Sequence, residues 1–507
     1  MKKIKGVISL AVVFAVCFMV NTCFAVTTTK VLVSDSKVMV NGETISENSN
    51  DDIYLTHEMD NGGTSSEAKE ANVTVGNIVN IKNAGTYEFS GSLSDGQIAV
   101  NTNNVNGEIV ILLNGVNITC KNAPAIFVYN VNTDSSTCNV IIKTAKDSNN
   151  YVSGGLIKQS VEGWTDQDKI LYSIEKAYND EGEYFERYKY DGAVSSDISL
   201  TFEGEGNLTI ESQREGIESK RDITINSGNY VINSMEDGMN AAQDNESVIT
   251  INGGKILVNN KGTEGDGIDS NGYIYVNGGE IYTFASPTSQ DSGLDSDLGI
   301  YINGGKLVAI GNMYDEIKED SKQNSVTFQF NSKITAGTLI SLVDEDNKPV
   351  MAFETDREYT VITFSMPGLE GKTYTAYEGG TVEGTKVNGL YTDITSYTLG
   401  AKLDANVLTG SVKPFGNDRN IKRNDGVNVF LVIAMGMLLA VSIAGAVILI
   451  VMKKGNIISV ILGVLAGIAI STIVFSFVNK NGPQMPRGEF DNRPPMEDFG
   501  NSDRQPR

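Results

Sequence analysis

The chain has 507 residues, which is enough for two or three domains. It carries 63 acidic residues against 40 basic ones, with a formal net charge of -23 at pH 7. Such a charge disfavours nucleic acid and anionic membrane surfaces as partners and permits divalent cations. The single histidine, His57, excludes a metal site built from several histidines.

Residues 1–25 have the pattern of a secretory signal peptide. Three early lysines precede an apolar run, and small residues precede the expected cleavage point after Ala25. A lipoprotein signal at Cys23 is the alternative. We therefore expect an exported protein, in which residues 26–75 form an N-terminal extension.

Two cysteines, Cys120 and Cys138, remain after removal of the signal peptide. Export would place them in a compartment where disulfides form. The sequence leaves open whether they pair or stay as two buried thiols.

Two uncharged apolar runs near the C-terminus are each long enough to cross a bilayer as a helix. They cover residues 429–452 and 457–478, and two lysines lie between them. We expect a transmembrane two-helix hairpin that anchors the protein in the lipid bilayer of the cell membrane, with the exported part on the extracellular side. The flanking segments are a linker, 413–428, and a disordered tail, 479–507.

A repeat of about 25 residues dominates the middle of the chain. Its most regular element is an Asn-Gly-Gly or Asn-Ser-Gly corner, which begins at Asn226, Asn252, Asn277 and Asn303. A short alternating strand precedes each corner and another follows it, while a third strand opens each unit. Three strands in each repeat without a helix predict an all-β fold whose repeats are coils of a parallel β-helix.

The predicted β-helix spans residues 76–325, with an insert at 162–190, and a small β domain follows at 326–412. Period-2 alternation places Ile225, Ile251 and their equivalents in one inward stack. We expect each corner Asn to bond to the backbone of its own turn. An outward column of apolar residues (Val231, Leu257, Tyr282 and Val308) predicts that another part of the chain covers that face.

Stacking of the coils would align acidic residues that are far apart in the sequence. Carboxylates ~4.8 Å apart repel by roughly 3 kcal/mol at an effective dielectric of 20, and Ca²⁺ relieves such repulsion because it takes several carboxylate, amide and carbonyl oxygens. A solvated acidic face is the alternative. The candidate metal ligands share positions on or just before the opening strands: Asp237, Asn240, Asp266, Asp269, Asp291 and Asp295.

Outward tyrosines form a second candidate site. Tyr275 and Tyr301 share one predicted column with threonines of earlier coils, and Tyr273 lies close by. Flat rings on a sheet suit carbohydrate binding, because they can stack on sugar faces while polar neighbours bond to hydroxyls. The alternative is that tyrosine is simply a good strand residue.

Catalytic interpretations have less support, and we predict no catalytic residues. A pectate-lyase-type site needs Ca²⁺ and a basic residue, and Arg214, Lys220 and Arg221 lie near the predicted acidic column. They are equally explained as surface counter-charges.

The chain resembles the bacterial carbohydrate-binding-domain proteins typified by a clostridial cellulose- and pectin-binding surface protein. The resemblance extends over about residues 76–405 and rests on the wording and order of four motifs, at 113–119, 264–272, 302–305 and 389–392. It implies a right-handed parallel β-helix that binds cellulose and polygalacturonate, carries calcium and has no established catalysis. Asp266 and Asp269 are the best-matched acidic positions, and Asp237, Asn240 and Asp295 follow by their place in the repeat.

This chain departs from the family pattern in two places. We expect the insert at 162–190 to cover a face that the family uses for ligand, and Glu215 and Glu218 replace the usual aspartates in the first regular coil. The sequence therefore predicts a membrane-anchored, extracellular protein that binds polysaccharide of the cellulose or polygalacturonate class with the support of calcium. The alternatives are a polysaccharide lyase on the same coils and a non-catalytic structural or adhesion protein of the envelope.

Overall fold

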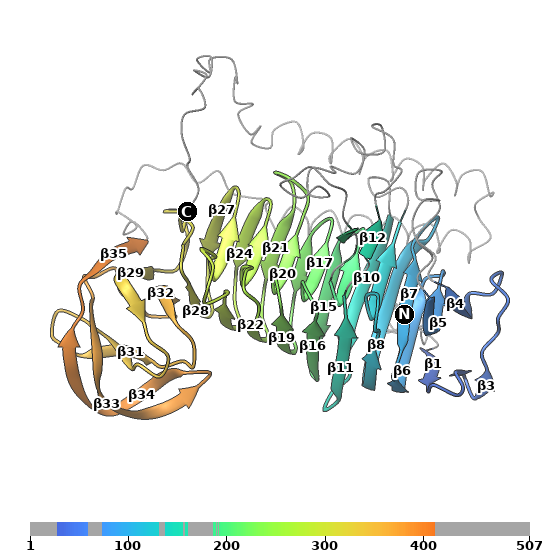
Figure 1. The fold of residues 1–507 in the computed structure, drawn as a ribbon, viewed down its shortest axis with the longest axis horizontal. Coiled ribbons are helices and arrows are strands. Elements are labelled where there is room, and N and C mark those ends of the chain that lie inside the picture. The colour runs from blue at the N-terminus through green and yellow to red at the C-terminus, as the bar shows by residue number, and fades with distance from the viewer. Residues whose placement is uncertain are drawn as a thin grey trace, which may run out of the picture. The chain divides into compact units, whose positions relative to one another are not determined.

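The computed structural model describes residues 28–58, 74–130, 137–155, 158–160, 186–188, 190 and 192–410. Within these ranges the chain forms strands and turns (Figure 1). Most strands belong to two large sheets, one of 20 strands and one of nine, and four later strands close a barrel. The candidate site residues lie on the two large sheets or in the loops that lead into their strands.

Each regular coil of the chain contributes three strands, one to each of three faces that run along the molecule. Face 1 is the nine-stranded sheet, in which all neighbours are parallel except β4 and β5. Its strands are β4 (Ile53–Glu58), β5 (Thr74–Ile81), β7 (Gly96–Asn101), β9 (Ile126–Tyr129), β14 (Val194–Ser196), β17 (Ile217–Ser219), β20 (Met239–Ala241), β23 (Ile268–Ser270) and β26 (Leu294–Ser296).

Faces 2 and 3 belong to the 20-stranded sheet and are parallel along the coils. Face 2 contains β6 (Gly85–Leu93), β8 (Asn106–Thr119), β10 (Thr137–Thr144), β15 (Leu200–Gly204), β18 (Ile223–Ile225), β21 (Val248–Ile251), β24 (Tyr273–Val276) and β27 (Gly299–Ile302). Face 3 contains β11 (Asn149–Gly154), β16 (Asn207–Ser212), β19 (Asn229–Ser234), β22 (Lys255–Asn260), β25 (Glu280–Phe284) and β28 (Lys306–Gly311), and the end of β8 pairs with β11. This arrangement is that of a β-helix.

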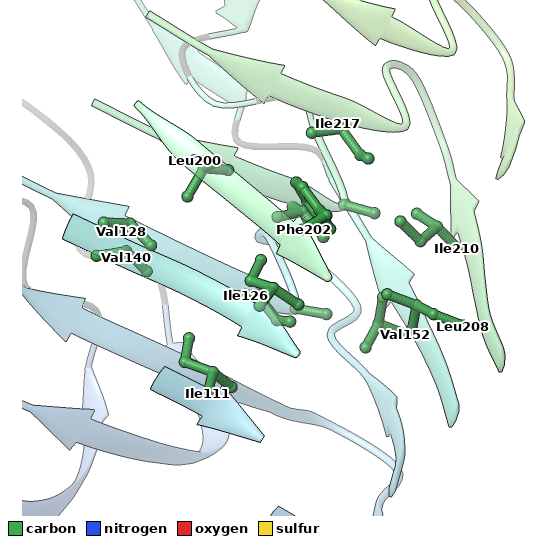
Figure 2. Packing of buried hydrophobic residues seen from close by; sticks show 14 of the residues in the cluster. Ile111, Ile126, Val128, Val140, Val152, Leu200, Phe202, Leu208, Ile210 and Ile217 are labelled. Carbon is green, nitrogen blue, oxygen red and sulfur yellow. The ribbon is translucent and has the colours of Figure 1, made fainter. Parts of the chain in front are cut away.

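The interior of the coils is an apolar core built from inward residues of all three faces. Register pairs place Ile225, Ile251, Val276 and Ile302 in one stack, and each side chain is fully buried. Figure 2 shows the same principle in the earlier coils, where Val140 and Leu200 of face 2 and Ile126 of face 1 point into one interior. A single coil cannot bury such a face, so burial depends on its neighbours.

The tight backbone geometry of the corners explains why glycine recurs there. A Cβ on Gly278 would lie 2.5 Å from the carbonyl oxygen of Asn252 in the preceding coil, so the first glycine permits close approach. The second glycine, Gly279, has φ +93°, which L side chains rarely adopt. The corner asparagines differ from the prediction, because their side chains bond to one another across coils. Each Nδ2 donates to the Oδ1 of the preceding corner at 2.9 Å, along Asn226, Asn252, Asn277 and Asn303.

The N-terminal strands continue the sheets to that end of the core. Strand β1 (Thr28–Val33) pairs parallel with β6 and antiparallel with β2 (Met39–Val40), which in turn pairs with β3 (Glu43–Thr44). A separate two-stranded sheet joins β12 (Lys158–Ser160) and β13 (Glu186–Tyr188).

The outward apolar column of face 3 is covered at Tyr282 and Val308, as its composition predicted, while Leu257 is partly buried and Val231 lies outside the covered part. Tyr282 and Val308 are almost completely buried in a second core cluster with Val326, Phe328 and Phe364 of the following strands. These strands are β29 (Ser325–Ile334), β32 (Tyr359–Ser365) and β35 (Ala405–Gly410), and β32 extends face 3 by antiparallel pairing with β28.

Arg357, which lies just before β32, contacts the ends of the face 3 strands β22 and β25. Its guanidinium donates to the backbone carbonyls of Asn260 (2.8 Å) and Ala285 (3.2 Å) and lies over the ring of Phe284. The remaining strands close the barrel in the order β30 (Ile340–Val343), β31 (Pro349–Phe353), β34 (Leu390–Lys402) and β33 (Thr375–Val387).

The fold class predicted from the sequence was wrong in one component. It joined the β-helix to a transmembrane helical hairpin, whereas the described residues are all-β. Across those residues no helix is long and apolar enough to cross a membrane. In the described residues the apolar side chains alternate with a period of two, which is the period of a strand. The backbone N–H and C=O groups therefore pair between strands and not within a helix. The two runs on which the hairpin rested, 429–452 and 457–478, lie outside the described residues.

Residues 1–25, 413–428 and 479–507 also lie outside the described part. Of the insert predicted at 162–190, the structure describes β13 and Tyr190, whose ring packs edge-on against Phe127. The question left open for the cysteines has an answer: Cys120 and Cys138 are both buried thiols and not a disulfide. Burial raises the pKa of the Cys120 thiol to about 12 and that of Cys138 to about 11.

The asparagine ladder makes a stability prediction. Replacing Asn277 by alanine removes two side-chain hydrogen bonds, one to Asn252 and one from Asn303. At about 0.5–1.5 kcal/mol for each exposed bond, we expect a loss of about 1–3 kcal/mol in the free energy of unfolding, measured by denaturant titration. Asn226→Ala is the matched control, since that end rung has one ladder bond and should lose about half as much. Equal losses in both variants would contradict a role for the ladder.

Candidate functional site

The acidic strip is the set of predicted metal ligands on and beside face 1: Asp237, Asn240, Asp266, Asp269, Asp291 and Asp295. Asn240, Asp269 and Asp295 are direct register partners on β20, β23 and β26, so they follow one another coil by coil. Their side chains alternate with fully or nearly buried apolar residues such as Ile268 and Leu294. The period-2 pattern of the strands therefore points all three outward.

A second column precedes the strands and is held by backbone hydrogen bonds. Asp237 Oδ1 accepts a hydrogen bond from the backbone N–H of Asp266 (2.7 Å), and Asp266 Oδ1 accepts one from that of Ser292 (2.5 Å). Ser292 thus occupies the place in the column that was predicted for Asp291. Asp291 is displaced by one residue, and its Oδ2 accepts from the backbone N–H of Gly265 at 2.6 Å.

Burial and mutual repulsion shift the pKa values of three carboxyls strongly upward. Burial is the main cause in each case. It raises the pKa of Asp266 to about 9 and that of Asp269 to about 8, and the charge of nearby Asp237 adds to both. The pKa of Asp295 rises to about 6 through burial and the charge of Asp315. The strip is thus a place where negative charge is costly without a compensating cation.

Asp315 belongs to this site and was missed from the sequence. Its Oδ2 accepts from the backbone N–H of Ser296 at 2.7 Å, and it shares a hydrogen bond with the carboxyl of Asp295. Parallel bridges from Ser292 to Met313 and from Ile300 to Ile317 show that the chain continues as part of one more coil after the last Asn-Gly-Gly corner. The spacing of 20 residues from Asp295, close to one repeat, was the signal that could have found it.

The donors of the strip are all oxygen atoms, which suits Ca²⁺ in kind. Asn240 Oδ1 is buried and has no hydrogen-bond partner in the described part of the chain, while its Nδ2 donates to Glu215 Oε1 (3.0 Å) and Asp237 Oδ2 (3.3 Å). Among the described residues, however, no three histidine, cysteine or acidic side chains gather as a metal-binding group. The carboxylates lie one coil apart, so a bound ion would need backbone or amide oxygens as well.

The tyrosine cluster lies on face 2 and consists of Tyr273, Tyr275 and Tyr301. The rings of Tyr275 and Tyr301 stack with centroids 5.0 Å apart and an interplanar angle of 15°. Tyr273 lies 5.9 Å from the first ring and 6.0 Å from the second, tilted by 38° and 52°. All three side chains are partly exposed, so the structure brings the three predicted residues together on one surface.

The basic residues near the strip are engaged with acids. Arg214 pairs with Glu236, Lys220 with Asp197 at 2.7 Å, and Arg221 with Glu246 at 3.8 Å. Lys220 also lies over the ring of Tyr190. These contacts match the interpretation of the three residues as counter-charges. In the first regular coil, Glu218 is buried and accepts a hydrogen bond from Ser195 (2.6 Å), which gives it a structural contact.

Comparison with known proteins assigns the family. The model of the carbohydrate-binding domain-containing protein family matches residues 75–388, more than half of the chain. The chain therefore belongs to this family of carbohydrate-binding domain-containing proteins, in agreement with the resemblance seen in its motifs.

Two individual proteins are similar to parts of this chain. A carbohydrate-binding domain-containing protein of Acetivibrio thermocellus is 28% identical over 155 residues, which span 30% of this chain and 44% of the relative. A solved structure of a polysaccharide lyase-like protein from C. thermocellum, a gadolinium derivative, aligns with 55% of this chain and 93% of its own, at 19% identity and a TM-score of 0.33.

The raised pKa values predict that stability depends on pH when calcium is removed. Carboxyls whose folded pKa lies at about 6–9, above the ordinary value of 3.8, stabilise the fold fully below pH 4 and lose that effect as pH rises through the folded values. In chelator, we expect the melting temperature to fall between pH 5 and pH 9, measured by calorimetry. Asp269→Asn should flatten the slope, whereas the exposed control Glu264→Gln should not. A slope identical in all three proteins would contradict the assignment.

Proposed function

We propose that this protein is a non-catalytic polysaccharide-binding protein that acts outside the cell. Membership of a carbohydrate-binding family supports the coarse function. The observation that carries the proposal is the tyrosine cluster, because partly exposed rings on a parallel sheet offer apolar surface for sugar rings. The sugars expected from the sequence, of the cellulose or polygalacturonate class, are the proposed ligands.

We further propose that Ca²⁺ supports this function at the acidic strip. The raised pKa values of Asp266 and Asp269 support this proposal, because burial and the charge of Asp237 make the ionised carboxylates costly and a bound cation would offset that cost. Asp237, Asn240, Asp291 and Asp295 supply further oxygen donors on the same strip. The ion would hold neighbouring coils together or bridge to the carboxylates of a uronate polymer.

Polysaccharide binding is tested by isothermal titration of the full-length protein with soluble cello-oligosaccharides and oligogalacturonides, with and without chelator. We expect binding heat with at least one of the two classes, and co-sedimentation with the corresponding insoluble polymer. Absence of heat and of co-sedimentation for both classes would overturn the proposal. Release of unsaturated uronate products, detected by ultraviolet absorbance, would favour the lyase alternative.

Calcium binding is tested by melting the full-length protein in calcium and in chelator. A ligand that binds only the folded state stabilises it by about 2.7 kcal/mol at about a hundred times its Kd, so a rise of several degrees is expected. The double variant Asp266→Asn/Asp269→Asn should lose this rise, while the exposed control Glu264→Gln keeps it. An equal rise in the double variant would show that calcium binds elsewhere. A calcium-dependent rise without binding of any glycan would favour the structural envelope alternative.

A further inference from the structure

The stacking of Tyr275 on Tyr301 restricts which ring faces a ligand can reach. Strands β24 and β27 are neighbours, and their rings are nearly parallel at 5.0 Å, so each ring turns one face toward the other. The free face of Tyr275 must then be on the side of β21, where Thr250 is its register partner. Since a tyrosine side chain is longer than a threonine, the ring rises above Thr250. We call Tyr275, Thr250 and Asn252 the Tyr275 step.

The far face of Tyr301 is flanked by the chain that follows the last corner. Ile300 forms a parallel bridge with Ile317, so the next residue, Lys318, runs alongside Tyr301. The Lys318 side chain lies over Gly299, where it would collide with any Cβ, and its Nζ pairs with Glu316 at 3.5 Å. The outer face of Tyr301 is therefore flanked by Lys318, whereas the outer face of Tyr275 looks toward the shorter side chain of Thr250.

Polar groups for hydroxyl recognition lie at the foot of the ring. Thr250 is partly exposed, and within the described part of the chain its hydroxyl has no hydrogen-bond partner. The exposed amide of Asn252 uses one N–H for the ladder and accepts from Asn277, which leaves its second N–H to solvent. An apolar wall above a hydroxyl and an amide is the arrangement that a sugar ring fits, because it has C–H groups on its faces and hydroxyls at its edge.

The charges around the step distinguish between the two glycan classes. Asp222 lies beside it, since its Oδ1 accepts from the backbone N–H of Val248, the register partner of Tyr273. Asp320 is near enough to contribute to the raised pKa of Tyr275. The neighbouring cation, Lys318, is already paired with Glu316. A uronate carboxylate would meet negative charge here, whereas a neutral pyranose would not.

We propose that the Tyr275 step binds a neutral pyranose glycan, with the sugar stacked on the Tyr275 face that looks toward Thr250 and with Tyr301 as a positioning residue behind that ring. This inference rests on the proposed polysaccharide-binding function and deepens it, since it assigns neutral glycan to face 2 and leaves uronate polymers to the acidic strip of face 1. Tyr301 acts through Tyr275, because its stacking holds the ring upright.

The test is titration of the full-length protein with cellohexaose, a neutral oligosaccharide, and with an oligogalacturonide. We expect Tyr275→Ala to weaken cellohexaose binding at least tenfold and Thr250→Val, which keeps the shape of the side chain, to weaken it two- to fivefold. Tyr301→Ala should weaken it several-fold, and Tyr301→Phe should restore it, because only the ring is needed. Oligogalacturonide binding should stay unchanged in all four variants.

The outcomes separate this inference from the function on which it rests. Wild-type protein that binds the oligogalacturonide but not cellohexaose would overturn the inference and leave the proposed function standing. Cellohexaose affinity unchanged within twofold in Tyr275→Ala would also overturn it. Absence of binding to both sugars would remove the proposed function itself. Melting curves of each variant show whether a loss of affinity comes from unfolding, and a Tyr275→Phe variant then supplies a folded protein that keeps the ring and should still bind.

Discussion

The in-register stacking of parallel coils is the constraint on which this molecule depends. Strands of three residues, such as β20, β23 and β26, bury only two side chains each and cannot be stable alone. Repetition turns these small contributions into a continuous core and also aligns every equivalent side chain at the coil spacing. The same geometry therefore produces the apolar interior, the asparagine ladder, the acidic strip and the tyrosine cluster.

Placing identical side chains one coil apart is energetically favourable for some residue types and unfavourable for others. Stacked amides are favourable, because an Asn side chain can donate one hydrogen bond and accept another. The ladder therefore runs without a break from Asn226 to Asn303. Aromatic rings gain as well, since offset stacking is favourable. Stacked carboxylates repel one another, and this repulsion adds to the burial that raises the pKa values of Asp266 and Asp269. Negative charge on these buried carboxylates opposes folding, and a bound cation would offset that cost. For this reason a cation is proposed for the acidic strip and not for other acidic parts of the surface.

The three faces divide the surface into regions with different chemistry. Face 3 is covered near its C-terminal end by β29 and β32, which removes Tyr282 and Val308 from contact with solvent. Face 1 carries negative charge, and face 2 carries rings, hydroxyls and amides. Because a turn of only two residues, Asn271 and Gly272, separates β23 from β24, Asp269 and Tyr273 stand on adjoining faces. The two faces thus differ in chemistry, and this difference is the basis of the proposed division between charged and neutral sugars.

The sequence by itself determined the coil repeat, its register and the residues that stack, because period-2 alternation and the spacing of the Asn-Gly-Gly corners are local signals. The repeat pattern alone therefore predicts that Tyr273, Tyr275 and Tyr301 lie near one another. Tertiary structure alone decided which atoms meet: the corner amides bond across coils and not within their turns, Ser292 takes the place expected for Asp291, and Asp315 joins the strip from a partial coil that lacks the motif. It also showed that Cys120 and Cys138 stay apart and that the rings of Tyr275 and Tyr301 face each other. These outcomes depend on side-chain orientation and on one-residue differences in loop length, which a repeat pattern does not encode.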